Sequence, residues 1–468
     1  MKYQIHCLRK TVLLFFGCFL VASCVLIAGC SSRQEGDTLK GDSAFKIMYA
    51  DDRTFFSAYG DLFSMRHPDI DIKVVSDLGL YDEGKDPIQS MKEYVDREQP
   101  DVIVLNTEQY EYFAEEGLIL DLEPLIQRDH YDIAGIYPGV IDILKFLGND
   151  KLYGFSPDFY SDGILFNREI FKKYGVEEPT GPLTWDEIFA LAARFPIDGD
   201  ESARIFGYDE QYSHSSGISN YLHAVSRTEG LSWVNTDTMT VTVETDSWKE
   251  VFELAVDALK SGALPAAGEN ELSPDMSNYF ARKLFLNGRA AMTTGSVFFF
   301  YEMEEADKLL KNFKKFEVGI VPGPVSSLER DKTTGIMMNE IFAINAASAN
   351  VDASWEFIKF AAGDELAKIK SRRVSSSLLA RTGYSTDFNG QSMEMFYSLK
   401  PVLRSTLDDS KIPAGFNGPF SELLNRELML VKEEKKSLAE AMRLIQEEGQ
   451  VILDQAIRDQ AMKGSGGN

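Results

Sequence analysis

From residue 45 onward, short apolar runs of strand length alternate with stretches in which apolar residues recur at helical spacing. The runs 45–50, 70–75 and 101–106 predict strands, and the stretches at about 55–67 and 87–97 predict helices. Strands that alternate with helices indicate βαβ units and a mostly parallel sheet. The continuous apolar centre of the third run suits such a strand, because parallel strands are buried on both faces.

The same alternation continues to the end of the chain, and its last third is mainly helical. Thr184 comes directly before Trp185, with the carboxylate of Glu187 three residues on, which predicts a helix start with a capping box. Further strands are predicted at 163–166, 290–293, 318–322 and 341–344, and further helices at 168–174, 247–260, 272–286, 352–362, 419–432 and 437–460.

The N-terminus follows a different pattern. Residues 11–28 are almost wholly apolar or small, and the ten residues before them hold three Lys or Arg and no acidic residue. This order is typical of a secretory signal, although a run of about 18 residues could also span a membrane. The run ends in Ile27, two small residues and Cys30, which resembles the bacterial lipobox. We therefore expect 1–29 to be a lipoprotein signal peptide and Cys30 to be the lipidated first residue of the mature chain.

Cysteine usage and charge exclude several classes of protein. All four cysteines lie at or before Cys30, so the mature chain can form no internal disulfide and no thiolate metal site. The formal net charge of −25 argues against nucleic acid or anionic phospholipid as the main partner. The sequence has no HExxH, GxSxG or Walker motif, and the acidic stretch 196–202 lacks the ligand spacing of a calcium loop. We expect no metal and no cofactor.

The two ends of the mature chain have the composition of flexible segments. Residues 30–44 are expected to form a lipidated flexible tether, because they are polar and rich in Gly, Ser and Asp. Residues 463–468 are expected to form a disordered tail. The length between them is enough for at least two domains.

Four segments, in this order, carry a resemblance to a known family. They contain an apolar strand followed by "GLILDL", the combination of "LYG", "LFNREIF" and "TWDE", the sequence "FLNGRAAMTTGS", and the sequence "FAINAASANVDASWEFIKF". The segments are 101–122, 152–187, 285–296 and 342–360. The chain thus resembles the bacterial extracellular solute-binding proteins of the ABC-transporter sugar class, the group that includes maltose-binding protein.

The resemblance implies a two-lobed periplasmic-binding-protein-like α/β fold of type II, with the ligand cleft at the hinge. Each lobe would be a mostly parallel sheet flanked by helices. Lobe one would comprise 45–153 with 340–383, and lobe two 154–339 with 384–462. The implied protein is a monomeric, lipid-anchored receptor on the extracellular face of the membrane. It would bind a carbohydrate, expected to be an oligosaccharide, and deliver it to the permease subunits of an ABC importer.

A carbohydrate site needs aromatic planes and directed hydrogen-bonding groups, and in α/β sheets it lies beyond the carboxyl ends of strands. The first and third strands place five candidates there, although the aspartates could simply cap a helix: Tyr49, Asp51, Asp52, Asn106 and Glu108. The resemblance implies further candidates, whose aromatic members could equally be core: Asp158, Tyr160, Asp162, Trp233, Phe298, Phe299, Phe416 and Asn417. Trp185 and Trp355 are expected to be structural.

Three functional hypotheses follow. The first is the non-enzymatic sugar receptor described above. The second keeps the receptor fold but binds a peptide or other polar solute, or serves a membrane sensor. The third is a surface glycoside hydrolase or lyase using Asp51, Asp158 or Asp162, which would require two carboxylates at roughly 5–5.5 or 6.5–9.5 Å.

Overall fold

The computed structural model describes residues 43–80, 86–200, 204–210, 217–265, 275–372, 376–384, 387–388 and 390–465. The expected signal peptide, Cys30 and nearly all of the expected tether lie outside the described residues. Helix α18 (Leu438–Ser465) extends into the segment expected to be a disordered tail, of which only 466–468 lie outside the described residues. Within the described ranges, no helix combines the length and apolar character needed to cross a bilayer.

One sheet contains the first strands of the chain and one strand from a remote segment. Its order is β2 (Ile70–Ser76), β1 (Ser43–Tyr49), β3 (Val102–Leu105), β13 (Ile341–Ile344) and β4 (Gly154–Phe155). Strands β1 and β3 are parallel, whereas β13 is antiparallel to both β3 and β4. The sheet is therefore mixed. The expectation of a mostly parallel sheet considered only strands joined by successive helices, and β13 enters from the second half of the chain.

A second sheet is also mixed. Its order is β11 (Val318–Pro322), β6 (Gly163–Asn167), β10 (Ala290–Gly295) and β7 (Phe206–Tyr208). Only the β10–β7 pair is parallel, while β6 runs antiparallel to both of its neighbours. Strands β6 and β11 are buried at every position, which explains their apolar sequences up to the last residue of β6, Asn167.

Each predicted helix is found, some with shifted ends, whereas other helices, among them Pro138–Leu147, Ile218–Thr228 and Phe298–Leu309, were not predicted. Preceding or following strands of the first sheet are α2 (Asp52–Phe55), the π-helical turn η1 (Phe56–Gly60), α3 (Asp61–Arg66), α4 (Pro87–Glu98), α5 (Thr107–Glu115), α6 (Glu123–Asp129), α7 (Pro138–Leu147), α14 (Val351–Ala361) and α15 (Asp364–Lys370). The others are α8 (Arg168–Tyr174), α9 (Trp185–Ala192), α10 (Ile218–Thr228), α11 (Asp246–Lys260), α12 (Met276–Arg282), α13 (Phe298–Leu309), α16 (Leu407–Ser410), α17 (Ala414–Lys432) and α18.

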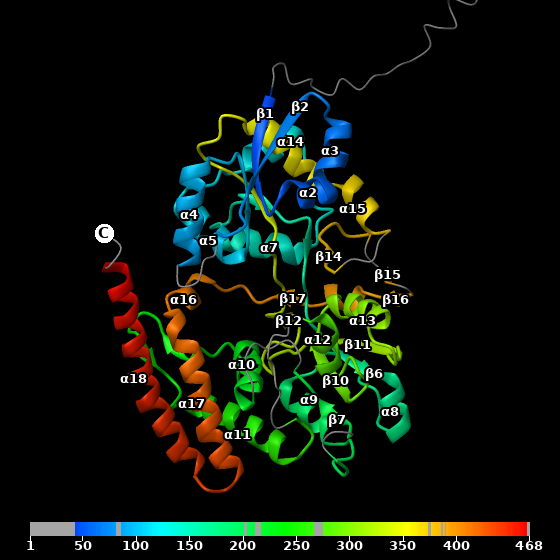
Figure 1. Ribbon diagram of the computed structural model, residues 1–468, viewed down its shortest axis with the longest axis vertical. Helices are drawn as coiled ribbons and strands as arrows, with labels where there is room; N and C mark the ends of the chain where they lie inside the picture. The colour runs from blue at the N-terminus through cyan, green and yellow to red at the C-terminus, as the bar shows by residue number, and fades with distance from the viewer. Residues whose placement is uncertain are drawn as a thin grey trace, which may run out of the picture. The chain divides into compact units, whose positions relative to one another are not determined.

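Local capping explains several of the helix starts. The Thr184 backbone N–H donates to the Glu187 carboxylate at 2.9 Å, which confirms the expected helix start. Helix α12 is shorter than expected and begins at Met276, after the capping carboxylate of Asp275. Helix α17 begins earlier than expected, so that Phe416 lies in a helix rather than in a loop. Figure 1 shows α17 and α18 side by side, and they contact α11 as well as each other.

Two segments carry the chain between the sheets. The first holds β5 (Asp158–Phe159), which pairs with β14 (Leu378–Leu379). The second, between β11 and β13, holds β12 (Lys332–Thr333), which pairs with β17 (Lys400–Pro401). The remaining short elements are β8 (Val234–Asn235), β9 (Thr240–Val241), β15 (Asp387–Phe388), β16 (Gln391–Ser392) and the 3₁₀ turn η2 (Glu394–Tyr397).

Candidate functional site

A pocket of about 450 Å³ lies where α10, the carboxyl ends of β7 and β10, and the two connecting segments meet. This volume is in the usual range for a small-molecule site. Acidic, amide and hydroxyl groups alternate in its wall with aromatic side chains. The lining residues are Tyr160, Asp162, Trp185, Glu210, Asn220, His223, Ala224, Arg227, Thr228, Thr294, Ser296, Phe298, Pro324, Thr333, Thr334, Gly335, Met337 and Asn339.

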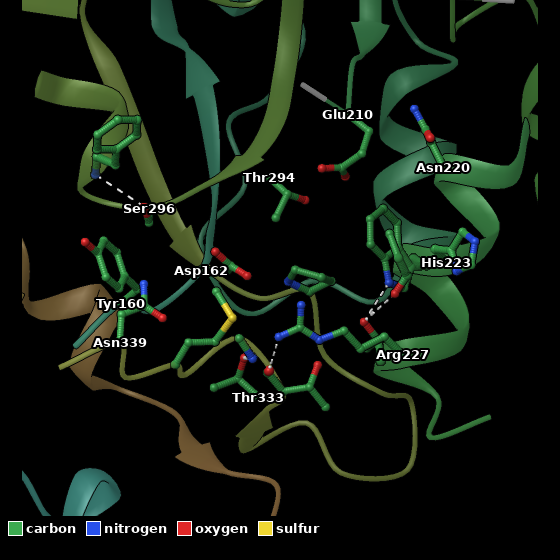
Figure 2. A pocket seen from close by; sticks show the side chains of 18 residues that line it. Tyr160, Asp162, Glu210, Asn220, His223, Arg227, Thr294, Ser296, Thr333 and Asn339 are labelled. Atoms are coloured by element: carbon green, nitrogen blue, oxygen red, sulfur yellow. Dashed lines mark hydrogen bonds between the residues drawn. The ribbon is translucent and has the colours of Figure 1, made fainter. Parts of the chain in front are cut away.

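Two carboxyl groups face the middle of the pocket. Figure 2 shows Asp162, Glu210 and Thr294 pointing toward a common space. Burial raises the pKa of Asp162, and it raises the pKa of Glu210 to about 8 with a smaller contribution from the charge of Asp162. The hydroxyl of Tyr208 donates to Glu210 and lies 2.8 Å from the Thr294 hydroxyl. At neutral pH the Glu210 carboxyl can therefore donate as well as accept a hydrogen bond.

One guanidinium group balances this acidic side. Arg227 projects from α10 toward the same space, and its Nη2 donates to the Thr334 carbonyl at 2.6 Å. Its charge lowers the pKa of Asp162, against the larger rise caused by burial. The pocket thus holds two carboxyl groups and one cation from three different elements of the chain.

Aromatic and imidazole groups complete the wall. Trp185 borders the pocket but is only 1% exposed and belongs to the core, which agrees with the structural role expected for it; its indole N–H donates to the Thr228 hydroxyl at 2.9 Å. The His223 ring points away from Asp162 in Figure 2. Its Nδ1 accepts a hydrogen bond from the indole N–H of Trp233 at 3.2 Å, and burial lowers its pKa. The imidazole is therefore part of the packing behind the pocket.

Of the residues selected from the sequence, Tyr160, Asp162 and Phe298 line the pocket. Asp158 lies behind it, where its carboxylate accepts a hydrogen bond from Lys370 at 3.2 Å. The first connecting segment therefore contributes to the wall at its residues 160 and 162, and their contact with a ligand stays a prediction.

The candidates at the first sheet lie outside the pocket wall. Tyr49 is buried and donates to a carboxylate outside the pocket, that of Glu340. Asp51 caps α2, where it accepts from the backbone N–H and the hydroxyl of Thr54 at 2.8 Å each. Asn106 likewise caps α5, where it forms a capping box with Gln109. Two further candidates, Asp52 and Glu108, lie in the first turns of α2 and α5.

Of the remaining aromatic candidates, Phe299 and Phe416 are buried, and Trp233 is partly buried and packs against the hydrophobic core. Phe299 and Phe416 are 0% and 1% exposed, which leaves no ring face for a ligand. Trp233 stacks on Trp248 with ring centroids 3.9 Å apart. Asn417 is exposed in the first turns of α17 and does not line the pocket. The amphipathic pattern around these residues could not separate a stacking platform from a core ring, because both need an apolar face.

Sequence reasoning missed several pocket residues. Glu210 follows strand β7, so the rule about strand ends would have selected it had that strand been recognised. Asn220 and Arg227 come from the first and last turns of α10, and Asn339 comes from a connecting segment without regular structure. No sequence signal marks such positions. Within the described part of the chain, no group of three His, Cys, Asp or Glu could hold a metal ion.

Comparison with known proteins identifies the fold and the family. The model of the family described as "Bacterial extracellular solute-binding protein" matches residues 42–368. An ABC substrate-binding protein from Listeria monocytogenes, in complex with cycloalternan, is 20% identical, with 87% of this chain and 98% of that chain covered and a TM-score of 0.58.

Two further solved structures share the fold. The cyclic alpha-maltosyl-1,6-maltose binding protein from Arthrobacter globiformis is 15% identical, with 89% of this chain and 100% of that chain covered and a TM-score of 0.58. UgpB from Mycobacterium tuberculosis, in complex with glycerophosphocholine, is 15% identical with the same coverage and a TM-score of 0.56. These similarities confirm the periplasmic-binding-protein-like fold. Because the family model matches well over half of the chain, the protein belongs to the bacterial extracellular solute-binding proteins, which are transport receptors rather than enzymes.

Proposed function

We propose that the protein is a lipid-anchored receptor that captures a carbohydrate and delivers it to the permease of an ABC importer. The observation that carries the proposal is the composition of the pocket wall. Directed hydrogen-bonding groups such as Asp162, Glu210 and Thr294 lie in one pocket with the aromatic rings of Tyr160 and Phe298. This combination matches the many hydroxyls and the weakly polar ring faces of a sugar.

The charges of the pocket favour an uncharged carbohydrate. Two carboxyl groups face one guanidinium, and that guanidinium already donates to a backbone carbonyl through Arg227 Nη2. A sugar that carries a phosphate or a carboxylate would meet like charges at Asp162 and, at high pH, at Glu210. Hydroxyl groups, in contrast, can donate to Asp162 and accept from a protonated Glu210.

Two structural neighbours support this ligand class. One was solved in complex with cycloalternan, and one is named as a cyclic alpha-maltosyl-1,6-maltose binding protein, whereas the third was solved with glycerophosphocholine. The glycerophosphocholine complex favours keeping one alternative, in which the same fold binds another polar solute. A receptor of this fold could also serve a membrane sensor instead of a permease.

We further propose that the two sheets belong to two lobes, which close on the ligand by hinge motion. Lobe one would comprise 45–153 with 340–383, and lobe two 154–339 with 384–462. All of the pocket-lining residues fall in lobe two, so closure would bring the strand ends of lobe one toward a ligand already held there.

The anchor is a separate part of the proposal and has its own test. Replacement Cys30→Ser should release the protein into the medium or leave it unprocessed. Metabolic labelling with a radioactive fatty acid measures the modification directly, and unchanged labelling of the Cys30→Ser variant contradicts the assignment.

Mass spectrometry of small molecules that co-purify with the protein tests the ligand class. Thermal unfolding with a panel of maltotetraose, cycloalternan, D-mannitol, glucuronic acid and glycerophosphocholine complements it. A ligand at 100 times its Kd adds about 2.7 kcal/mol to the unfolding free energy. Stabilisation by a neutral carbohydrate but not by glucuronic acid is expected. Stabilisation by glycerophosphocholine alone would establish the polar-solute alternative. If no carbohydrate co-purifies with the protein and none stabilises it, the proposal is refuted.

A further inference from the structure

Alternate residues of the segment 335–340 face opposite sides. Gly335, Met337 and Asn339 line the pocket. Met338 is only 1% exposed, and its carbonyl accepts a hydrogen bond from the hydroxyl of Thr107 at 3.1 Å. The period of two is that of an extended chain, in which side chains on one face are positioned by contacts on the other.

The side chain of Glu340 lies on the face of this segment that points away from the pocket. Its two carboxylate oxygens accept hydrogen bonds from two tyrosines, one bond each, at 2.6 Å: Oε1 from Tyr49 at the end of β1, and Oε2 from Tyr59 in the π-helical turn η1. Both rings are nearly inaccessible, at 8% and 2% exposed. Burial and the charge of Asp158 raise the pKa of Glu340, and the two tyrosine hydroxyls lower it, so they stabilise the charged form.

The cluster formed by Glu340, Tyr49 and Tyr59 also contacts the first connecting segment, which contains Asp158. Lys370 donates to the Tyr59 hydroxyl at 3.1 Å and to the Asp158 carboxylate at 3.2 Å. The Ser156 hydroxyl lies 2.8 Å from the Glu340 carbonyl and 2.6 Å from the Asp158 carbonyl, so it bridges the two backbones.

Both segments carry pocket residues just beyond the cluster. Tyr160 is two residues from Asp158, and its N–H donates to the Met337 carbonyl at 2.8 Å. The Met337 N–H donates back to the Tyr160 carbonyl at 3.0 Å. A displacement of Glu340 would therefore reach the pocket wall directly at its neighbour Asn339 and, across Met338 and Asn339, at the two backbone hydrogen bonds between Met337 and Tyr160.

We propose that Tyr49 and Tyr59 are positioning residues of the pocket, which hold Glu340 and thereby fix Met337 and Asn339 opposite Tyr160. Neither tyrosine touches the pocket. The structure thus gives Tyr49, a ligand contact in the sequence analysis, an indirect role. The inference rests on the proposed function only for the chemical class of what the pocket binds.

Amide hydrogen exchange of the full chain without added ligand tests the positioning directly. Tyr49→Phe and Tyr59→Phe keep the rings but leave a buried carboxylate oxygen without its donor. Because a hydrogen bond to a charged group is lost, we expect exchange at the Tyr160 and Met337 amides to accelerate on the order of tenfold. A combination of Tyr49→Phe with Glu340→Ala should exchange no faster than Glu340→Ala alone, since the tyrosine acts through that carboxylate.

The matched control is Tyr94→Phe. Tyr94 is also nearly inaccessible, and its hydroxyl donates to the Ser76 carbonyl at 2.8 Å, away from the pocket. This variant should accelerate exchange near β2 and α4 but leave the amides of Tyr160 and Met337 unchanged. Glu340→Gln, which keeps one acceptor, should exchange more slowly at these amides than Glu340→Ala.

A purely structural role would give a different pattern. If Tyr49→Phe accelerates exchange evenly along the chain, or affects Tyr160 and Met337 no more than Tyr94→Phe does, the positioning role is wrong. The Kd of the tightest carbohydrate in the panel above should rise about tenfold in Tyr49→Phe and stay unchanged in Tyr94→Phe. If no carbohydrate binds the unmodified protein, the proposed function fails, while the exchange pattern still decides the positioning role.

Discussion

The buried carboxyl of Glu210 predicts that the protein loses stability as the pH rises from about 5 to 8. Burial is the main reason that the pKa of Glu210 rises from 4.5 to about 8 in the folded chain. Between these values the folded chain holds a proton that the unfolded chain has released. The stabilisation due to this proton is complete below about pH 4.5 and is lost as the pH rises through about 8.

The size of the effect follows from the shift. One pKa unit corresponds to about 1.4 kcal/mol, so the complete shift corresponds to about 5 kcal/mol. Glu210 lines the pocket and is only partly buried, so that solvent screens its charge, and we therefore expect about 1–3 kcal/mol. Glu210→Gln replaces the carboxyl by a neutral amide of the same shape, which removes the dependence on pH.

Urea unfolding of both proteins at about pH 5.5, 7 and 8.5 measures the difference. The unfolding free energy of the unmodified protein should fall relative to Glu210→Gln by about 1–3 kcal/mol over this range. Glu253→Gln is the control, because Glu253 is an exposed carboxylate of α11 whose side chain is 52% accessible. Equal pH slopes for Glu210→Gln and the unmodified protein, or an unfolding free energy of the unmodified protein that rises relative to that of Glu210→Gln as the pH rises, would refute the reasoning.

Three further substitutions separate ligand binding from stability. Asp162→Asn should weaken carbohydrate binding on the order of tenfold in titration calorimetry, since a charged acceptor is lost, without lowering the melting temperature; a lowered melting temperature would contradict this. Trp233→Ala should cost about 3–5 kcal/mol in urea unfolding, because the ring stacked on Trp248 leaves a cavity; a loss below about 1 kcal/mol would be inconsistent with a core role. Asp51→Ala should lower the free energy of unfolding by about 1 kcal/mol, because it removes the cap of α2, and should leave the ligand affinity unchanged. A tenfold weaker affinity would instead identify Asp51 as a ligand contact.

Much of the secondary structure could be predicted because it is encoded locally. The capping carboxylate of Glu187, for example, marks the start of α9 within three residues. The pairing of the strands could not be predicted in the same way, since nothing within β3 indicates that its neighbour is β13, more than two hundred residues later. Register and direction depend on contacts between remote segments, which a local pattern does not contain.

The residues of the pocket could likewise be predicted only in part from local sequence patterns. Asp162 was found because it follows a motif of known position, whereas Arg227 lies among the residues of an ordinary amphipathic helix. Trp233 and Phe416 show why aromatic residues mislead, because an apolar ring suits a core as well as a sugar. The strand ends selected from the sequence, those of β1 and β3, lie outside the pocket wall, whereas the end of β7 and the helix α10 that line the pocket became visible only in the structure.

The antiparallel contact between β3 and β13 has a consequence for how the chain folds. Ile341 pairs with Leu105, so about 236 residues are synthesised between the two partners. At roughly 5–20 residues per second this takes about 12–47 s. During that time one edge of β3 exposes unpaired backbone groups and apolar side chains, a template for pairing with other chains. The first sheet is thus a structure of high contact order that cannot be completed as it emerges, and the early chain depends on delayed folding or on a chaperone to avoid aggregation.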